Sequence, residues 1–596
     1  MSSNSPLDWT DDGQPRSRLY GDVYFSTEDG LAESRAVFLE GCGLPLAWEG
    51  RRRFSVGELG FGTGLNILAL LDLWRRTSDP AARLHVFSIE AHPITADEAA
   101  KALSRWPELA DLTAALTARW PGRARGFHRV DLPQFRAVLD LAVMPVEDAL
   151  AAWTGWADAW FLDGFSPALN PDMWREEIMA LVAARSAPGA RAATFTVAGA
   201  VRRGLAAAGF EVDKRPGHGR KRERLEARLP TAPEPEQPAP RVAVIGAGIA
   251  GASAARALRA LGCEPLVFQA GPGASGNPAA LVTPRLDAGL GPVARLFAQA
   301  FARAVRLYED IPGAVIARSV LQLAGGERDA ERFARIAASD LFESGALAVL
   351  DAEEATARLT EPAPAALDQA AALVVDPAAI LQAWSGLTQT AAVASLARTT
   401  DGWTLRDADG AEIAAVDAVI LAAGQESAAL WPSLDLRPVR GQASWAPWQA
   451  PIQAAAWGGY AIPTRDGVLF GATHDRGETG MEVRQADHQR NLDAVAQALP
   501  GLAAGLARAD LQGRAAIRAT TADHLPIAGP ADGAPGIFLL TGFGSRGFCL
   551  APLLADHVAA QILGAPSPMP VELARSVAPD RFRLRAERRG RNIATS

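Results

Sequence analysis

The sequence has little cysteine and no long apolar run. Only three cysteines occur in 596 residues, Cys42, Cys263 and Cys549, and none lies in a CxxC or other metal-binding spacing. We therefore expect buried thiols in a reducing cytoplasm and no bound metal. No apolar stretch reaches the roughly 18 residues that a membrane helix needs. The first residues, MSSNSPLDWTDDG, are neither basic nor apolar, so the sequence predicts neither a membrane span nor a signal peptide.

A general excess of positive charge is also missing. The formal net charge is −8, and residues 1–240 carry 28 basic and 32 acidic side chains, against 31 and 35 in the remainder. Any contact with nucleic acid must therefore be local. Residues 202–228 hold nine basic and four acidic side chains, including HGRKRER at 218–224, and residues 575–591 hold seven arginines and two acids. Each surplus indicates either an RNA contact or a solvated surface.

The length and one segment indicate the domain organisation. A chain of 596 residues is too long for one core, and its 49% hydrophobic and 21% charged residues are typical of globular domains. Residues 230–240, PTAPEPEQPAP, are rich in proline and predict an extended linker. We expect an α/β domain at 1–229, this linker, a second α/β domain at 241–575 and a basic tail at 576–596.

The central motif is RVAVIGAGIAG at 241–251. A short apolar run leads into Gly246, Gly248 and Gly251 in G-x-G-x-x-G spacing, and helix-forming sequence follows. These glycines allow a tight turn, close approach of backbone amides to a pyrophosphate, and packing of the helix on the strand. The motif predicts a dinucleotide site, and the alternative is a strand–turn–helix unit with only a structural role.

Three further features of the second half bear on a cofactor. The strand predicted at 264–268 ends in Gln269, where a dinucleotide site usually has Asp or Glu, so only an uncharged hydrogen bond to a ribose is available. The next loop, GPGASGNPAALVTPRL, can wrap the ribityl or pyrophosphate of a flavin. The segment LLTGFGSRGFCLAP at 539–552 repeats the strand–loop–helix scheme and can present backbone amides. The candidate cofactor residues of these two loops are Ser275, Gly276, Asn277, Gly544, Ser545, Arg546 and Gly547.

A different glycine loop lies in the first half. The segment FSVGELGFGTGLN at 54–66 predicts a strand ending at Glu58, a loop and a helix, and a second strand at 84–89 leads to Glu90. The G-x-G-x-G spacing, with an acid after the next strand, is typical of an S-adenosylmethionine pocket, because the carboxylate can accept both ribose hydroxyls. An NAD site, the alternative, would use the longer spacing. The candidate residues are Glu58, Gly60, Gly62, Gly64 and Glu90.

The strand predicted at 157–161 leads into LDGFSPALNPDMW. Asp163 follows the strand directly, so in a doubly wound sheet it lies at the reactive end of the cofactor. Methyl transfer to nitrogen needs a neutral amine, and Asp163 can hold that amine and receive its proton while Phe165 lines the slot. In the alternative interpretation Asp163 only caps a turn. Asp172 is then expected to cap the helix that carries Trp174.

The second half also predicts an antiparallel layer. Residues 458–477, GGYAIPTRDGVLFGATHDRG, have the alternation and the turn of a hairpin, and such a layer can cover a substrate. The segment AAIRATTADHLPIAGP at 515–530 places Arg518 in a strand.

With these segments assembled, the chain resembles the bifunctional tRNA 5-methylaminomethyl-2-thiouridine biosynthesis proteins over nearly its whole length. The similar motifs are DVYFSTEDGL, ELGFGTGLN, WFLDGFSPALNPDMW, ATFTVAGAVRRGL, GRKRE, VIGAGIAG, GASGN, VRGQ, ATHDRG, ATTADHLPIAG and GSRGFC. The resemblance implies a Rossmann-like methyltransferase using S-adenosylmethionine, followed by an FAD enzyme similar to glycine oxidase and sarcosine oxidase. It implies that the FAD half removes carboxymethyl from 5-carboxymethylaminomethyl-uridine at the tRNA wobble position. The methyltransferase then methylates the released amine.

The resemblance also implies residue roles. Arg518 matches the arginine that binds the substrate carboxylate in related amine oxidases, although an ion pair of purely structural meaning is the alternative. Tyr460 is implied to help hold the substrate, and Arg546 to face the flavin. Ala522 stands where we expect an arginine. The tRNA contacts are expected at Arg202, Arg203, Arg220, Lys221 and Arg222.

Two other functions remain open at this point. A fused amine oxidase and N-methyltransferase acting on free amino acids predicts turnover that is nearly insensitive to salt, whereas RNA binding predicts a steep salt dependence. A non-catalytic RNA-binding scaffold predicts a colourless protein that binds no methyl donor.

Overall fold

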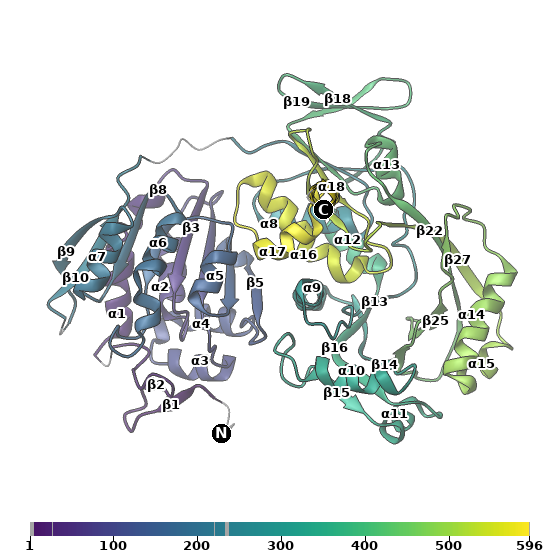
Figure 1. The fold of residues 1–596 in the computed structure, drawn as a ribbon, viewed down its shortest axis with the longest axis horizontal. Helices are drawn as coiled ribbons and strands as arrows, with labels where there is room; N and C mark the ends of the chain where they lie inside the picture. The colour runs from purple at the N-terminus through teal and green to yellow at the C-terminus, as the bar shows by residue number, and fades with distance from the viewer. Residues whose placement is uncertain (1–4, 27, 220, 233–237, 595–596) are drawn as a thin grey trace. The chain divides into compact units, whose positions relative to one another are not determined.

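The computed structural model describes residues 5–26, 28–219, 221–232 and 238–594 (Figure 1). The chain divides into two compact units. The first comprises Met1–Pro238 and Ala565–Val571, and the second Ala239–Gly564 and Glu572–Ser596. The division at Pro238 falls inside the segment expected as a linker, but the short segment 565–571 belongs to the first unit, which the sequence did not indicate. Within the described ranges, no helix is long and apolar enough to cross a bilayer.

The first unit is built on an eight-stranded sheet with the order β5-β6-β4-β3-β7-β8-β10-β9. Strands β3, β4, β6, β7 and β8 run parallel, while β5, β9 and β10 are antiparallel to their neighbours. The strand order reverses at β3, which lies between β4 and β7, so a crevice opens at the carboxyl ends of these strands. The strands are β3 (Arg53–Leu59), β4 (Arg83–Ile89), β5 (Gly126–Leu132), β6 (Ala137–Val143), β7 (Ala157–Leu162), β8 (Ser186–Thr194), β9 (Glu211–Pro216) and β10 (Glu223–Arg228).

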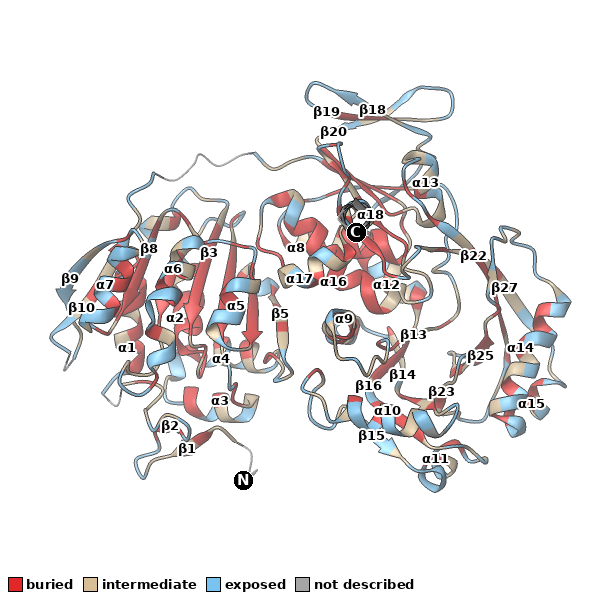
Figure 2. Ribbon diagram, in the orientation of Figure 1, coloured by how far each residue is buried: buried red, intermediate tan, exposed pale blue. Residues whose placement is uncertain are grey.

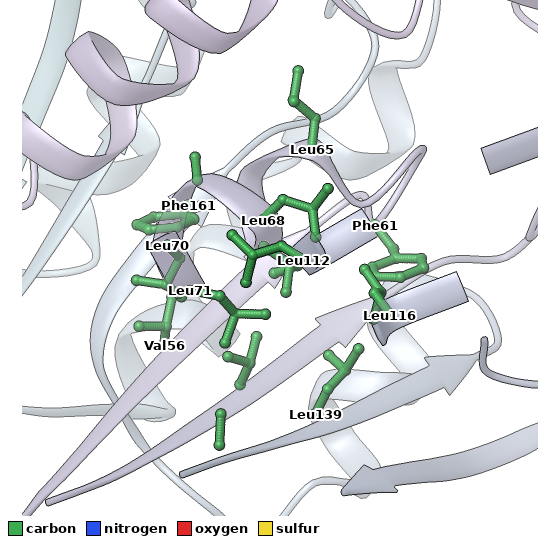
Figure 3. Close-up of a cluster of buried hydrophobic side chains, with 14 of the residues drawn as sticks. Val56, Phe61, Leu65, Leu68, Leu70, Leu71, Leu112, Leu116, Leu139 and Phe161 are labelled. Atoms are coloured by element: carbon green, nitrogen blue, oxygen red, sulfur yellow. The ribbon is translucent and has the colours of Figure 1, made fainter. Parts of the chain in front are cut away.

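Helices cover both faces of this sheet and enclose two cores. Successive residues of a strand point to opposite faces, so Phe161 of β7 packs in one core and Trp160 in the other. Figure 3 shows part of the first core, to which β3 contributes Val56, α2 Leu68 and α4 Leu112. In Figure 2 the central strands are buried, whereas β9 at one edge and the outer sides of the helices are exposed. The helices are α1 (Gly30–Ser34), α2 (Leu65–Thr77), α3 (Ala96–Leu103) and α4 (Ala110–Thr117) with the first core, and α5 (Val146–Ala152), α6 (Glu176–Ala184) and α7 (Gly199–Ala207) with the second.

A buried ion cluster lies at the β5–β6 edge of the sheet. Asp140 accepts hydrogen bonds from Nε and Nη2 of Arg129 at 2.8 and 2.7 Å, and one of its oxygens lies 2.7 Å from Nε2 of His85. Burial alone would raise the pKa of Asp140, but the guanidinium holds it well below its usual range. Arg129 also donates to the carbonyl of Pro566 at 3.1 Å, which fixes the segment 565–571 to this edge.

The second unit contains a six-stranded sheet with the order β17-β12-β11-β21-β29-β28. All neighbours are parallel except β28 and β29, and the order reverses at β11. Helix α8 (Ile249–Ala260) follows β11, and α16 (Gly547–Leu563) follows β29. The strands are β11 (Val242–Ile245), β12 (Leu266–Gln269), β17 (Thr388–Thr390), β21 (Ala418–Leu421), β28 (Ile527–Pro530) and β29 (Ile537–Thr541). This arrangement and that of the first unit confirm the expected α/β fold class.

A second, mostly antiparallel sheet forms the other layer of this unit. The expected hairpin is present as β24 (Tyr460–Pro463) and β25 (Gly467–Gly471), which pair with each other. The remaining strands are β13 (Ala280–Val282), β14 (Val315–Leu323), β15 (Leu347–Leu350), β16 (Ala366–Val375), β22 (Arg437–Pro447), β23 (Ala454–Ala456), β26 (Asp475–Arg476) and β27 (Gln512–Thr520). A separate small sheet consists of β18 (Ser395–Thr399), β19 (Gly402–Arg406) and β20 (Glu412–Val416), and its Trp403, Leu405 and Val416 share a core with the six-stranded sheet (Figure 1).

The second unit contains further helices besides α8 and α16, and the expected basic tail includes the end of α17 and the whole of α18. They are α9 (Pro292–Glu309), α10 (Glu327–Ala337), α11 (Ala352–Leu359), α12 (Pro377–Ser385), α13 (Ser427–Leu430), α14 (Gln485–Ala498), α15 (Pro500–Leu506), α17 (Val571–Val577) and α18 (Arg581–Ala594).

The ion cluster predicts a large stability effect. Asp140→Ala removes the carboxylate that compensates the buried Arg129 charge, so we expect the first unit to lose about 3–5 kcal/mol. Urea unfolding of the full chain, followed by tryptophan fluorescence, measures this loss. Asp111→Ala, which removes an ion pair with Arg75 at the surface, should change stability by less than about 1 kcal/mol. Equal effects of the two substitutions would contradict the prediction.

Candidate active sites

A cavity of about 990 Å³ opens at the reversal point of the first sheet. Its lining includes residues that follow three neighbouring strands: Gly60 after β3, Glu90 after β4 and Asp163 after β7. The segment around Tyr20 and Tyr24 forms another part of the wall. Such a volume is sufficient for a nucleoside-sized cofactor together with the reacting part of a substrate.

The glycine loop lies directly on the end of β7. Gly60 has a φ of +91°, and a Cβ atom there would lie 2.0 Å from the carbonyl oxygen of Asp163. A side chain at this position would therefore force the loop away from the sheet and close the cavity. The backbone-lined floor that results fits the close approach of a cofactor such as S-adenosylmethionine. Gly62 and Gly64 share the left-handed backbone.

The two candidate carboxylates of this pocket occupy different places. Glu90 lies in the wall and accepts hydrogen bonds from the backbone amides of Gly62 at 3.1 Å and His92 at 2.9 Å, so its carboxylate is fixed at the glycine loop. Glu58 lies inside β3, which ends one residue later than expected, and it is fully buried behind the wall. Burial raises the pKa of Glu58 to about 8.

Asn66 connects the buried carboxylate to the candidate catalytic one. Its Nδ2 donates to Asp163 at 2.7 Å and to Glu58 at 3.2 Å, while its Oδ1 accepts from the hydroxyl of Ser34 at 2.7 Å. Burial raises the pKa of Asp163 to about 7, against the Asn66 hydrogen bond, which lowers it. The partner of Asp163 is therefore a side chain 97 residues away rather than the following turn. Sequence analysis missed Asn66, although it ends the motif ELGFGTGLN.

Aromatic side chains enclose the same cavity. The ring of Phe165 lies 5.0 Å from that of Tyr20 and 5.3 Å from that of Tyr24, and all three line the cavity. The indole of Trp174 donates to the carbonyl of Phe165 at 2.9 Å and holds this loop in place. The prediction that Asp172 caps the helix carrying Trp174 is wrong. That short helix begins after Asn170, with no capping bond from its side chain, because a proline at its first position supplies the turn.

The basic residues predicted to contact tRNA gather after β8 and between β9 and β10. Arg202 and Arg203 are exposed on α7, and Arg222 is exposed before β10. Lys221 lines the cavity, with its ammonium 2.7 Å from the carboxylate of Glu33 and 3.9 Å from the ring centre of Phe195. Arg220 lies outside the described residues.

In the second unit the central motif packs in a similar way. Gly246 has a φ of +100°, and a Cβ atom there would lie 2.6 Å from the carbonyl oxygen of Ala422. A Cβ atom on Gly251 would lie 1.7 Å from the carbonyl of Gly246, so helix and loop are in direct contact. Gly248 precedes α8, whose first amide, that of Ile249, donates to the hydroxyl of Ser275 at 3.0 Å. Because these glycines carry no side chains, a pyrophosphate can approach the helix N-terminus closely.

An arginine that sequence analysis missed holds the loop expected to wrap the cofactor. Arg514 on β27 donates to Asn277 at 3.3 Å and to the carbonyl of Gly273, and its guanidinium lies against Gly276. Gln269 is the last residue of β12, the position at which a dinucleotide site usually has Asp or Glu. Its side-chain amide donates to the carbonyl of Gly271 at 2.9 Å. The local sequence around Arg514 does not indicate this role, because the residues that it contacts lie more than 230 positions away.

The second glycine-rich loop lies beside the first helix. A Cβ atom on Gly547 would be 3.0 Å from the side chain of Ile249, so α16 and α8 begin side by side. Gly544 donates to the carbonyl of Ala519 at 2.8 Å, and Ser545 is exposed. Arg546 points inward and donates to the carbonyl of Thr283 at 3.1 Å, and burial lowers its pKa. Two adjacent helix N-termini suit the phosphates of a dinucleotide.

Arg518 on β27 and Tyr460 on β24 lie close to each other in the antiparallel sheet. Arg518 extends from β27 over Gly441, where a Cβ atom would lie 2.2 Å from its Nη1, and it donates to the carbonyl of Thr473 at 3.2 Å. Among the described residues it forms no salt bridge, which argues against a purely structural ion pair. Burial lowers the pKa of Arg518 and raises that of Tyr460, and each side chain acts on the other. A guanidinium with free donors beside a phenol suits a carboxylate.

The tail of the chain fastens the turn that follows Arg518. Arg581 is buried and donates to both oxygens of Asp523 at 3.0 Å, and to the carbonyl of Leu525 at 2.8 Å. Arg585 pairs with the same carboxylate. These two arginines of the basic tail therefore have a structural role, and Ala522 lies in the turn that they hold.

The buried carboxyl group of Glu58 predicts a pH-dependent stability. Its pKa in the folded protein, about 8, is above the ordinary value of 4.5, so the folded state keeps a proton that the unfolded state releases. This contribution is complete below pH 4.5 and is lost as the pH rises to 8. Glu58→Gln should remove roughly 3 kcal/mol of the decrease between pH 5 and 8.

Thermal unfolding at several pH values, followed by tryptophan fluorescence, checks this prediction. Glu211→Gln, at an exposed position of β9, is the matched control and should keep the parent pH dependence. An unchanged pH dependence in Glu58→Gln would show that Glu58 is ionised in the folded protein.

Comparison with known proteins assigns both units. A family model of S-adenosyl-L-methionine-dependent methyltransferases matches residues 107–230, and one of FAD dependent oxidoreductases matches residues 241–561. A solved structure, glycine oxidase from Geobacillus kaustophilus, has a TM-score of 0.47 and 23% identity, covering 55% of this chain and 96% of that one.

Similar proteins cover the whole chain. The tRNA 5-methylaminomethyl-2-thiouridine biosynthesis bifunctional protein of Caulobacter sp. (strain K31) is 64% identical over 591 residues, 98% of each chain. The protein of the same name from Caulobacter vibrioides is 61% identical over 97% of this chain and 98% of its own, and that from Maricaulis maris 44% identical over 98% and 97%. The first unit is an S-adenosylmethionine-dependent methyltransferase and the second an FAD-dependent oxidoreductase. The chain belongs to the family of tRNA 5-methylaminomethyl-2-thiouridine biosynthesis bifunctional proteins.

Proposed function

We propose that this chain modifies the wobble uridine of tRNA in two steps. The second unit removes carboxymethyl from 5-carboxymethylaminomethyl-(2-thio)uridine, and the first unit methylates the 5-aminomethyl group to 5-methylaminomethyl. The observation that carries the proposal is the 64% identity to a bifunctional relative of that name over 98% of both chains. Because the proposed substrate is tRNA, we also propose that the protein acts in the cytoplasm.

In the oxidoreductase step, the residues of the second unit orient the substrate arm. Arg518 binds its carboxylate, and partial burial strengthens this charge-assisted contact. Tyr460 lies beside the guanidinium and helps to hold the arm. FAD, when bound, accepts the two electrons released as the carbon beside the amine is oxidised. Water then releases the two-carbon fragment as glyoxylate and leaves the primary amine on the uridine.

In the methyltransferase step, the first unit positions the amine and takes up its proton. S-adenosylmethionine, when bound, supplies the methyl group. Asp163, in its ionised form, accepts a hydrogen bond from the amine and receives the proton that leaves as the new C–N bond forms. Asn66 fixes the orientation of that carboxylate, and Phe165 packs against the arm. Glu90 and the backbone of Gly60, Gly62 and Gly64 hold the cofactor.

The exposed basic residues at the edge of the first sheet contact the tRNA backbone in this proposal. Arg202, Arg203, Lys221 and Arg222 all follow β8 or precede β10, and Lys221 lines the cavity itself. The charges of Arg202, Arg203 and Arg222 position the RNA without reading its sequence, whereas the ammonium of Lys221 is paired with Glu33. This placement brings the anticodon arm to the cavity from which the amine is methylated.

Nucleoside mass spectrometry tests this division of labour. In tRNA from cells that express Arg518→Ala as the only copy, we expect 5-carboxymethylaminomethyl-uridine to accumulate, because the loss of a charge-assisted pair costs roughly 100-fold in kcat/KM. Asp163→Ala should accumulate the 5-aminomethyl form. Arg583→Ala, which alters an exposed arginine of α18, serves as the control and should give the parent profile. The same nucleoside in both active-site variants, or an unchanged profile, would refute the proposal.

The Asn66 hydrogen bond predicts a shift of the pH profile. Because Asn66 stabilises the ionised form of Asp163, whose pKa is about 7, its removal should raise that pKa further. Methyl transfer by Asn66→Ala should therefore need a higher pH than methyl transfer by the parent protein. Single-turnover rates between pH 6 and 9 on the same tRNA measure the shift, and a parallel loss of rate at every pH would contradict it.

A further inference from the structure

We propose that the methyltransferase cavity selects its substrate by charge: it accepts the amine that has lost its carboxymethyl group and repels the amine that still carries the carboxylate. The inference rests on the proposed function and extends it, because it supplies a physical reason for the order of the two steps.

The lining of the cavity is strongly acidic. It includes eight Asp or Glu side chains but only two Lys or Arg side chains. Both cations are paired within the lining, since Arg175 lies 2.6 Å from Glu147 and Lys221 lies 2.7 Å from Glu33. An anion that enters the cavity therefore meets an excess of negative charge and no unpaired cation among these described lining residues.

The acids act on the place where the amine reacts. Burial raises the pKa of Asp163, against the Asn66 hydrogen bond and the charge of Lys221, and the charges of Glu33 and Asp22 add to the increase. An environment that disfavours the ionised form of Asp163 also disfavours a substrate carboxylate beside it. The rings of Tyr20, Tyr24 and Phe165 are a second, independent feature, because aromatic faces attract cations rather than anions.

The oxidoreductase site has the opposite preference. Arg518 presents a guanidinium without a salt bridge among the described residues, beside the phenol of Tyr460. A carboxymethylated amine is therefore attracted by the second unit and repelled by the first. Nitrogen chemistry alone does not enforce this order, because a secondary amine is also a nucleophile, and premature methylation would give a tertiary amine. The exclusion must come from the cavity.

Asp22 is a position at which the charge can be removed while the contact to the Phe165 loop is kept. One oxygen of its carboxylate accepts a hydrogen bond from the backbone amide of Ser166 at 3.0 Å, next to Phe165, and the other accepts from the backbone amide of Val23 at 3.0 Å. In Asp22→Asn the amide oxygen can accept the Ser166 bond, so the loop keeps this anchor while one negative charge and the bond from Val23 are lost. We assign Asp22 as a specificity-determining residue.

The experiment compares three wobble arms on one tRNA. The full-length protein carrying Arg518→Ala, which silences the oxidoreductase, receives S-adenosylmethionine and tRNA bearing an aminomethyl, a carboxymethylaminomethyl or a carbamoylmethylaminomethyl arm. The last arm is the neutral amide of the second and has nearly the same size. We expect the aminomethyl and amide arms to be methylated within about tenfold of each other in kcat/KM, and the carboxylate arm at least about 100-fold more slowly than the amide arm.

Each outcome has one meaning. If the amide arm is rejected as strongly as the carboxylate arm, the cavity selects by size and the charge proposal is wrong. If the carboxylate arm is methylated about as fast as the amide arm, the cavity does not select between them and the proposal is wrong. If the aminomethyl arm itself is not methylated, the proposed function fails rather than the selection.

The Asp22 substitution tests the assignment of the residue. In Asp22→Asn the preference for the amide arm over the carboxylate arm should decrease about fivefold, as expected for the loss of one partly screened charge near the reacting group. Asp213→Asn removes a charge from an exposed ion pair on β9 and should leave this ratio unchanged. Because the ratio compares two substrates on one protein, a lower fraction of folded variant does not alter it. An unchanged ratio in Asp22→Asn would overturn the assignment.

Discussion

Both candidate active sites depend on the same packing constraint, the contact of a glycine loop with the end of a neighbouring strand. In the first unit the loop after β3 presses Gly60 against the carbonyl of Asp163, and in the second the loop after β11 presses Gly246 against the carbonyl of Ala422. In each case a Cβ atom would overlap a backbone oxygen. The contact leaves a backbone-lined floor at the strand ends, and the functional side chains stand around that floor.

The glycines of these loops and the acidic residues at the neighbouring strand ends were predictable from the sequence. Glycine spacing, a preceding apolar run and a following helix identify a loop of this kind from local sequence alone. Asp163 and Glu90 follow directly after strands, so their places at the same edge were also predictable. Arg518 and Tyr460 came from the family resemblance, and the structure brings them into one environment.

The residues that support these groups were not predictable, because their contacts are long-range. Asn66 reaches Asp163 across 97 positions, and Arg514 reaches Asn277 across 237. No local pattern encodes such pairs. The same reason explains the wrong expectation for Asp172, where a rule for helix caps was applied to a short helix that begins with a proline. Glu58 was correctly placed in its strand, but its burial behind the cavity depends on Ser88 and Asn66 from other elements.

The number of basic residues in a segment also did not predict what that segment does. The two basic surpluses look alike in the sequence, yet the structure uses them differently. In the tail, Arg581 and Arg585 are bound to Asp523 and hold the turn between β27 and β28. Before β10, by contrast, Lys221 lines the methyltransferase cavity.

The turn held by Asp523 packs against the second glycine-rich loop, since a Cβ atom on Gly542 would lie 2.9 Å from the side chain of Thr521. The tail thus supports the oxidoreductase unit through shape, whereas the segment before β10 supplies Lys221 to the wall of the methyltransferase cavity. Arginine content alone does not separate these roles, because Arg581 and Lys221 are each paired with a carboxylate from a distant part of the chain, and the difference lies in where the fold places each pair.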